Sequence, residues 1–282
     1  MGRYKALALD IDGTLLNTKK EVTPGVLIQV ERLQKTGVPV IIASGRPEPG
    51  ISHVARAVHM DTLGGYILSF NGGKITEFQT GKVIYNKTIP VEYNAEVIDY
   101  AVKIPQAAVL TYENGKIITE NPENEYAQVE SKVVKMPLEK VESLKERAVF
   151  PVNKFLITGN PEILQREVEN MAEMFHGRLN IFRSEPYFIE IVPLGIDKAQ
   201  SLDYLLHTWG MTGDELVACG DGRNDVTMIE YAGMGVAMAN ACEDVKRASN
   251  YITASCDNDG VARVIKKFFP EPVPVAFCDI FS

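Results

Sequence analysis

The sequence predicts an α/β protein in which a doubly wound parallel sheet is interrupted by a smaller, inserted α+β unit. Short apolar runs alternate with helical patterns over the first ninety residues, and the same alternation returns after residue 190. The stretch between these parts carries two hairpin signals instead. We therefore expect residues 1–86 and 190–282 to form one core domain and residues 87–189 to form a second domain. A length of 282 residues suits two domains.

The first part of the chain predicts three strands buried on both faces, because its apolar runs are short and bounded by turn residues. These runs cover residues 6–9, 38–43 and 66–70. Apolar residues recur at near-helical spacing over residues 26–33, and Thr23 followed by Pro24 is typical of a helix start. Strands that alternate with helices form a parallel sheet with right-handed crossovers.

The last part of the chain continues this sheet. Its patterns predict strands at residues 216–219 and 235–238 and helices at residues 197–207, 224–231 and 261–269. The tail, residues 270–282, is apolar and rich in proline, and we expect it to lie extended against the core.

The middle of the chain predicts an α+β unit. Hairpins are expected at residues 74–89, with a turn at Thr80-Gly81, and at residues 108–119, with a turn at Asn114-Gly115. Helices are expected at residues 95–104, 138–147 and 163–175, and strands at residues 155–158 and 188–192. The acidic stretch 120–130 predicts a solvated face.

Charge and composition narrow the classes of partner. The chain has 29 Lys and Arg against 37 Asp and Glu, a net charge of −8, which disfavours nucleic acid and anionic membranes. No run approaches the roughly eighteen apolar residues of a membrane span, and two aspartates interrupt the apolar N-terminal run in a way that a signal peptide would not tolerate. The four cysteines form no C-x-x-C pair and are expected to be reduced thiols. We therefore expect a cytoplasmic protein.

The pattern Asp10-Ile11-Asp12-Gly13-Thr14 follows the first predicted strand. Carboxylates two residues apart point to the same side of an extended chain, and open α/β sheets bind ligands at the carboxyl ends of their strands. Two such charges stay ionised only if a cation intervenes or one carboxylate binds a proton. The pair suits a carboxylate nucleophile with a neighbouring acid/base and a hard divalent cation. A strand that ends in an Asp-Gly turn is the alternative.

A second pattern, Ser44-Gly45-Arg46-Pro47, follows the next predicted strand. A hydroxyl and a free backbone N–H at a helix start can bind an anion, and proline fits the first helical position. A simple strand-to-helix turn would look the same.

Two further features stand at strand ends in the last part. Lys198 opens a predicted helix, where a cation opposes the helix dipole unless a nearby anion compensates. The pattern Gly220-Asp221-Gly222-Arg223-Asn224-Asp225 places oxygen donors after a buried strand. Each feature alone is weak, but their joint occurrence at the ends of strands of one sheet favours a site for phosphate and a metal.

In this order along the chain, the four features resemble the four motifs of haloacid dehalogenase-type phosphatases. The insertion between the second and third motifs resembles the type-two cap of the Cof-type, YidA-like subgroup, as do the stretches NGG at residues 71–73 and SEPYFIE at residues 184–190. The likeness spans nearly the whole chain, except the tail beyond Pro270. It implies a Rossmann-like phosphatase core and an α+β cap that sets specificity.

The resemblance also implies a chemistry. Asp10 would attack the phosphorus of a phosphomonoester and form an aspartyl-phosphate, and Asp12 would act first as acid and then as base. Mg²⁺ would be held by the carboxylate of Asp10, the main-chain carbonyl of Asp12 and the carboxylate of Asp221, with support from Asp225. The groups implied to bind the phosphate are Ser44, Gly45, Arg46, Lys198 and Asn224.

The leading interpretation is thus a magnesium-dependent hydrolase of small phosphorylated metabolites, above all sugar phosphates. A phosphotransferase such as a phosphomutase and a non-catalytic sensor of a phosphorylated effector are the alternatives. A nicotinamide enzyme is disfavoured, because Gly233-Met234-Gly235 lies late in the sheet and lacks the third glycine of that fingerprint. The sequence assigns no substrate contact to any residue of the cap.

Overall fold

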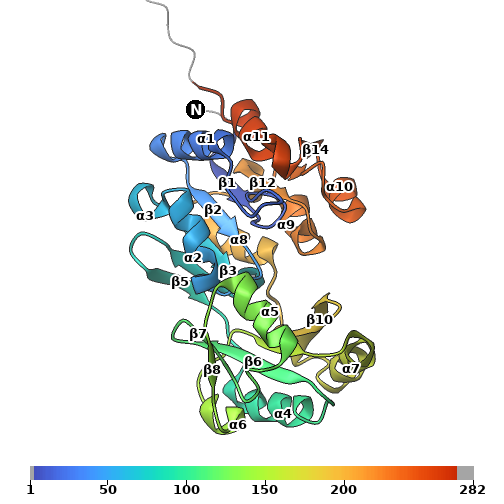
Figure 1. The fold of residues 1–282 in the computed structure, drawn as a ribbon. Helices are drawn as coiled ribbons and strands as arrows, with labels where there is room; N and C mark the ends of the chain where they lie inside the picture. Colours follow the sequence, from blue (N-terminus) through green and yellow to red (C-terminus); the bar gives the residue numbers. More distant parts are fainter. Residues whose placement is uncertain (1–2, 272–282) are drawn as a thin grey trace, which may run out of the picture.

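Two β-sheets with separate hydrophobic cores organise the chain (Figure 1). The computed structural model describes residues 3–271. The predicted fold class is confirmed: a mainly parallel sheet flanked by helices is joined to a smaller mixed α+β unit. The expectation for the tail concerns residues that lie, from residue 272 onward, outside the described part of the chain.

The larger sheet has eight strands in the order β14-β13-β12-β1-β2-β3-β4-β5. The first six run parallel, and β4 and β5 add the predicted hairpin in antiparallel fashion. Strand β1, which ends just before Asp10, lies in the interior of the sheet and all its residues are buried. The strands are β1 (Ala6–Leu9), β2 (Val40–Ala43), β3 (Tyr66–Ser69), β4 (Lys74–Glu77), β5 (Lys82–Asn86), β12 (Leu216–Gly220), β13 (Met234–Ala237) and β14 (Tyr251–Ile252).

Helices cover this sheet, and α1 and α11 lie side by side at one end of the molecule (Figure 1). Helix α1 begins as predicted, because the Thr23 hydroxyl accepts a hydrogen bond from the Val26 N–H and Pro24 occupies the first turn. The helices are α1 (Pro24–Lys35), α2 (Glu48–Ala57), α3 (Met60–Leu63), α8 (Lys198–Thr208), α9 (Val226–Tyr231), α10 (Glu243–Ala248) and α11 (Gly260–Phe268).

The smaller sheet has six strands in the order β10-β11-β9-β6-β7-β8, and we call it and its helices the cap. Helix α5 lies between this sheet and the main domain, whereas α4 and α6 lie on the far face (Figure 1). The strands are β6 (Ala108–Glu113), β7 (Lys116–Thr119), β8 (Leu138–Lys140), β9 (Phe155–Thr158), β10 (Leu179–Glu185) and β11 (Phe188–Pro193); the helices are α4 (Val91–Ala101), α5 (Glu125–Val134), α6 (Leu144–Arg147) and α7 (Pro161–Met174).

One prediction for the cap is wrong, and a second holds only in part. The helix expected at residues 138–147 is a strand, β8, followed by the short helix α6, because Leu138 pairs with Ile117 of β7 and Ser143 caps the helix. The solvated face expected at residues 120–130 is confirmed for Glu120, Glu123 and Glu125, which are exposed, but not for Glu130 of helix α5, which is buried. A smaller shift occurs in the main domain, where Pro47 is the N-cap of α2 and not its first residue.

The chain passes twice between the two units. The first connection follows β5, and the second lies between β11 and α8. The two connections touch, since the Lys87 ammonium donates a hydrogen bond of 3.1 Å to the Gly195 carbonyl. Strand β11 runs across the expected boundary at residue 189 and pairs with β9 and β10 of the smaller sheet.

Within residues 3–271, none of the helices is both long enough and apolar enough to cross a membrane. Three of the cysteines, Cys219, Cys242 and Cys256, are free thiols in the described residues.

Candidate active site

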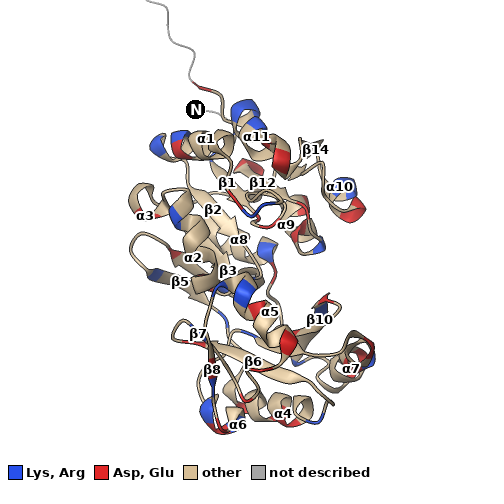
Figure 2. Ribbon diagram, viewed as in Figure 1, with Lys and Arg blue, Asp and Glu red and all other residues tan. Residues whose placement is uncertain are grey.

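A cleft of about 240 Å³ lies between the loops of the larger sheet and the cap. The main domain contributes Asp10, Asp12, Ser44, Gly45, Arg46, Gly222 and Asn224 to its lining. The cap contributes Glu130, Val133, Val134, Lys154, Ser184, Glu185, Phe188 and Glu190. Helix α5, which faces the main domain, carries basic and acidic residues (Figure 2). The lining of the cleft therefore combines apolar side chains with charged side chains of both signs.

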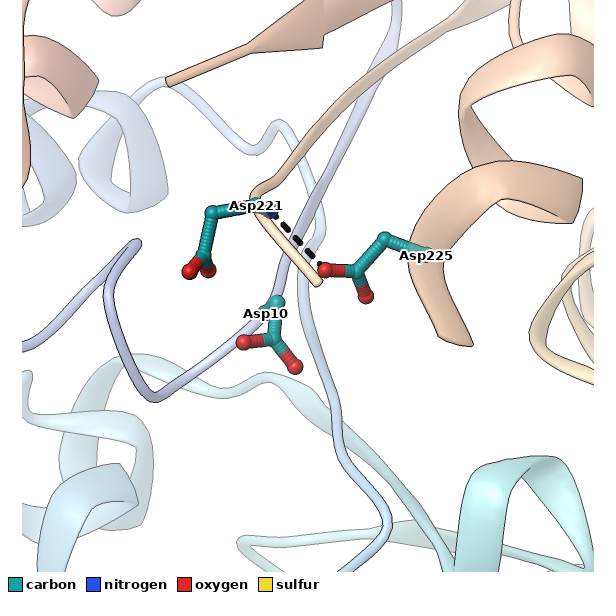
Figure 3. Close-up of side chains that lie close together, drawn as sticks. All are labelled: Asp10, Asp221 and Asp225. Atoms are coloured by element: carbon teal, nitrogen blue, oxygen red, sulfur yellow. Dashed lines mark hydrogen bonds between the residues drawn. The ribbon is translucent and has the colours of Figure 1, made fainter. Parts of the chain in front are cut away.

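Three carboxylates meet at the main-domain side of the cleft (Figure 3). Asp10 follows β1, Asp221 follows β12, and Asp225 ends the 3₁₀ helix Arg223–Asp225. One oxygen from each lies within 4.8 Å of the others. Parallel strands bring these residues together, because β1 and β12 are neighbours whose carboxyl ends lie at the same edge.

Lys198 supplies the positive charge among these acids. It is the first residue of α8, is fully buried, and donates to Asp10 Oδ1 at 2.7 Å and to Asp225 Oδ1 at 2.6 Å. The other oxygen of Asp225 accepts from the backbone N–H groups of Asp221 and Gly222 at 2.9 Å. Asp225 therefore fixes the shape of its own loop and holds Lys198 against Asp10.

The surroundings change the acidities of this cluster. Burial and the nearby carboxylate of Asp225 raise the pKa of Asp10 to about 7, although Lys198 acts in the opposite direction. Burial also raises the pKa of Asp221 to about 6. Burial alone would lower the pKa of Lys198, but the two carboxylates outweigh it and raise that pKa, so the ammonium stays charged.

Glycine is required where the first loop meets Asp221. Gly13 has a φ of +80°, and a Cβ at this position would lie 2.3 Å from Asp221 Oδ2. The next residue, Thr14, donates its hydroxyl hydrogen to Asp221 Oδ1 at 2.8 Å. The loop after β1 thus packs directly on the second carboxylate of the cluster and orients it.

Asp12 is held by cations. The guanidinium of Arg46 donates to both of its oxygens, Nε to Oδ2 at 3.0 Å and Nη2 to Oδ1 at 2.8 Å, and Lys20 Nζ donates to Oδ1 at 2.8 Å. Burial would raise the pKa of Asp12, but these cations outweigh it and the pKa lies below its ordinary value. Arg46 Nη1 also donates to the Val133 carbonyl of helix α5 at 3.2 Å, so the same side chain joins Asp12 to the cap.

The loops after β2, β3 and β12 close the cleft together. Ser44 is buried after β2, and its hydroxyl oxygen accepts from the Arg46 N–H at 3.3 Å. Asn224 Nδ2 donates to Asn71 Oδ1 at 3.1 Å. A Cβ on Gly45 would lie 3.0 Å from that Asn71 oxygen. The backbone of Gly45 and the amide of Asn224 are therefore packed around one side chain from the β3–β4 turn.

The residues predicted from the strand-end motifs lie at one edge of the larger sheet. Arg46 contacts Asp12, Lys198 contacts Asp10 and Asp225, and Thr14 contacts Asp221. Sequence reasoning assigned none of the cap residues of the cleft, among them the charged residues Glu130, Lys154 and Glu190. One signal was available, because Glu190 interrupts an apolar strand and a carboxylate is costly to bury without a partner.

Comparison with known proteins places these features in a wider group. A family model described as haloacid dehalogenase-like hydrolase matches residues 7–265. A crystal structure of a haloacid dehalogenase-like hydrolase from Bacteroides thetaiotaomicron is similar with a TM-score of 0.89 and 42% identity, covering 94% of this chain and 99% of that chain.

Two further similarities extend over both the main domain and the cap. The HAD subclass IIB sugar phosphatase BT4131 has a TM-score of 0.78 and 26% identity, with 94% of this chain and 99% of that chain covered. The 5-amino-6-(5-phospho-D-ribitylamino)uracil phosphatase YitU of Bacillus subtilis (strain 168) is 28% identical over 274 residues, which are 93% of this chain and 97% of the relative.

Proposed function

Because the chain belongs to the haloacid dehalogenase-like hydrolase family and is a phosphatase, we propose that it hydrolyses phosphate monoesters of small sugars and polyols through a phosphorylated aspartate, with Mg²⁺ as cofactor. The observation that carries this proposal is the position of Asp10. Its carboxylate is buried at the end of an interior strand, contacts Lys198, and lines the cleft that the cap covers.

The donor set fits a hard divalent cation. Three carboxylates crowd within 4.8 Å, and Lys198 contacts two of them, Asp10 and Asp225. Among the described residues, no protein group donates a hydrogen bond to Asp10 Oδ2 or Asp221 Oδ2. Oxygen donors of this kind suit Mg²⁺. We propose that Asp10, Asp221 and the main-chain carbonyl of Asp12 hold the ion, with Asp225 in support, and that the bound ion neutralises charge on the phosphoryl group.

The protein groups would carry out two displacements. Asp10 attacks the phosphorus, and the bond from phosphorus to the ester oxygen breaks. Arg46 and Lys20 keep Asp12 ionised in the ligand-free protein, so Asp12 must first bind a proton from water, which it then gives to the departing alkoxide. Asp12 then takes a proton from a water molecule that attacks the aspartyl-phosphate, which releases inorganic phosphate and restores Asp10. Both steps use the same two carboxylates, which line one cleft.

Positioning of the phosphoryl oxygens would fall to groups around the nucleophile. We assign this role to the Ser44 hydroxyl, the Gly45 N–H, the Asn224 amide and the Lys198 ammonium, because phosphoryl transfer depends mainly on position and charge. Arg46 faces the same cleft while its guanidinium is bound to Asp12. We propose that it orients Asp12 and also faces the phosphate ester.

The choice of sugars and polyols as substrates is supported by two similar proteins. BT4131 is a sugar phosphatase, and the substrate in the name of YitU carries a phosphorylated ribityl chain. The substrates named for these two proteins are both phosphate esters of alcohols with several hydroxyl groups. Residues of the cap form part of the lining of the cleft. We propose that such an alcohol lies against them and that the cap sets specificity and excludes water.

The test is to trap the phosphorylated protein. Wild-type protein mixed rapidly with Mg²⁺ and a labelled ester should carry the label on Asp10, and EDTA should abolish turnover until Mg²⁺ is restored. Asp10→Asn should neither take up label nor release phosphate. Asp61→Asn, at an exposed position in α3, is the matched control and should behave as wild type.

Two outcomes would change the assignment. Near wild-type turnover by Asp10→Asn would overturn the role of Asp10. Transfer of the phosphoryl group to an added alcohol but not to water would identify a phosphotransferase, in which a sugar hydroxyl replaces water in the second step.

A further inference from the structure

One wall of the cleft contains a buried carboxylate with an unused oxygen. Glu190, on β11, is only 7% exposed, and its Oε2 is buried without a hydrogen-bond partner. Its other oxygen lies 3.6 Å from Lys154 Nζ, which is longer than a hydrogen bond. A buried carboxylate without donors is costly. Because Glu190 lines the same cleft as Asp10, rotation of its carboxylate group would let a ligand in the cleft supply the missing donor.

Lys154 offers the complementary groups beside it. Its side chain is buried, and Nζ makes one long contact of 3.4 Å to the Gly45 carbonyl and lies 5.4 Å from the centre of the Tyr112 ring. An ammonium has three donors, so Lys154 retains donors for a ligand. A hydroxyl group can accept from an ammonium and donate to a carboxylate at the same time.

A purely structural ion pair would have a different geometry. Ammonium and carboxylate groups in such a pair approach to about 2.7–2.9 Å, as Lys198 does with Asp10. The wider separation between Lys154 and Glu190, together with the unused oxygen, leaves room for a third group to hydrogen-bond with both.

The charge of this wall also discriminates between ligands. Glu130, Glu185 and Glu190 contribute three carboxylates and Lys154 one ammonium group. Glu130 accepts from the Tyr112 hydroxyl at 2.6 Å. A leaving group with a second anionic group would meet repulsion here, whereas a neutral polyol or an amine would not.

We propose that Glu190 and Lys154 form the subsite for the alcohol part of the substrate, and that this subsite selects phosphate esters of neutral or amino sugars over esters that carry a second anionic group. The inference rests on the proposed function, because it concerns the leaving group of that reaction. Glu190 and Lys154 are then specificity residues, and the phosphate is bound by the groups of the main domain.

The experiment compares phosphate esters of a neutral sugar, an amino sugar, a sugar acid and a phenol. Values of kcat/KM are measured with Mg²⁺ for glucose 6-phosphate, glucosamine 6-phosphate and 6-phosphogluconate, and for p-nitrophenyl phosphate, whose leaving group has no sugar hydroxyls. Wild-type protein should prefer the first two esters over 6-phosphogluconate by about ten-fold or more.

The variant Glu190→Gln keeps the shape of the side chain but removes its charge. It should lose about ten-fold in kcat/KM for glucose 6-phosphate and most of its discrimination against 6-phosphogluconate, with p-nitrophenyl phosphate unchanged within about two-fold. Glu190→Asp, which keeps the charge but withdraws it, should lose activity on glucose 6-phosphate and keep the discrimination. Glu169→Gln, an exposed position in α7 of the cap, is the control and should match wild type.

The outcomes separate the two proposals. Equal wild-type rates on glucose 6-phosphate and 6-phosphogluconate, or an equal loss on all four esters in Glu190→Gln, would overturn the subsite alone. Absence of wild-type activity on p-nitrophenyl phosphate and on all the sugar esters would overturn the proposed function and the subsite with it.

Discussion

Asp10 and Asp12 stand two residues apart, yet their surroundings give them opposite acidities. Burial and Asp225 raise the pKa of Asp10 to about 7, whereas Arg46 and Lys20 outweigh burial at Asp12 and lower its pKa. At neutral pH, Asp12 is therefore ionised, and Asp10 is poised between its two forms. A cation beside Asp10 would favour the ionised form that a nucleophile requires.

Binding of Mg²⁺ should depend on pH as a result. The carboxyls of Asp10 and Asp221, with pKa values raised to about 7 and about 6, bind protons at mildly acidic pH, and a proton competes with a cation for the same oxygens. We expect Mg²⁺ affinity to fall by about ten-fold or more between pH 8 and pH 6. Titration calorimetry in buffers of different ionisation enthalpy would measure both the affinity and the protons released. An affinity that is constant over this range would contradict the prediction.

The Thr14 hydroxyl should matter for the same ion. Thr14→Val removes the donor to Asp221 Oδ1 and nearly preserves the shape of a side chain that is 1% exposed. Groups that orient metal ligands typically contribute ten-fold or more, so we expect Mg²⁺ affinity to fall by about ten-fold. Thr14→Ser keeps the hydroxyl and should stay near wild type. Equal affinities for the Val and Ser variants would show that the hydroxyl does not orient Asp221.

Residues beside a strand end were predictable, whereas contacts made by the cap were not. Asp10, Ser44 and Asp221 each follow a buried strand directly, so the rule for parallel sheets places them at one edge. The contact between Arg46 and Asp12 joins residues on different loops. Glu190 lines the cleft because the cap packs over the main domain. The local sequence pattern predicts neither of these contacts.

Among the elements, the turn after β3 connects the cleft to helix α8. Phe70 and Asn71 both have left-handed φ values, +54° and +55°, which are unusual for residues other than glycine. The Ser201 hydroxyl of α8 donates to the Gly72 carbonyl at 2.6 Å. Helix α8 begins at Lys198, so this turn helps to fix the position of the buried ammonium.

Close approach at this turn leads to a prediction. Gly72 has a φ of +97°, and a Cβ there would lie 2.4 Å from Ser201 Oγ. Gly72→Ala should lower the free energy of unfolding by about 3 kcal/mol or more, from backbone strain and the steric clash together, and should reduce activity by moving α8. Gly81, with a φ of +71° and open space around it, is the control.

Gly81→Ala carries a similar backbone cost without the clash. It should lower the free energy of unfolding by only about 1–2 kcal/mol and leave kcat/KM unchanged. Thermal or denaturant unfolding of both variants gives the comparison. Equal destabilisation of the two would mean that contact with α8 contributes nothing.

The predicted elements agree best with the structure where the pattern is long or strongly punctuated. Thr23-Pro24 marked the start of α1, and Asn114-Gly115 marked the turn of the β6–β7 hairpin. The prediction of a helix at residues 138–147 was wrong, because pairing of Leu138 with β7 outweighs the local helix preference. Helix α5 was not predicted, because one of its faces is buried by contact with other elements. At one such contact, Gly50 packs so closely on Val134 that an added Cβ would lie 3.0 Å from it.

For the whole molecule, the hydrophobic core of the larger sheet is separate from the apolar clusters of the cap, while polar contacts join the units across the cleft. Buried apolar residues of the larger sheet form one cluster, and those between residues 89 and 191 form two others. Arg46 donates to the Val133 carbonyl, and Lys154 donates to the Gly45 carbonyl. Polar contacts of this kind can break and re-form without disturbing either core, as opening of a cap requires.

Separate cores should give separate local stabilities. Ile157→Ala, at a fully buried position of the cap, removes packing that is typically worth about 2–5 kcal/mol. We expect faster hydrogen exchange at the amides of β6, β9 and β11 and unchanged exchange in β1, β2 and β12. Ile42→Ala, fully buried in β2, should have the reverse effect. Faster exchange throughout the chain in both variants would show that the units unfold as one.

The contact between Lys87 and Gly195 has a consequence for how such a chain can change over time. The two connecting segments between the larger sheet and the cap touch each other at this point. The cap is therefore an insertion whose two ends lie side by side. An insertion whose two ends lie side by side can be lengthened, shortened or exchanged for another without altering the pairing of β1 with its neighbours. We expect a hybrid that receives a foreign segment between these two points to keep the phosphate chemistry and to acquire the donor's choice of alcohol.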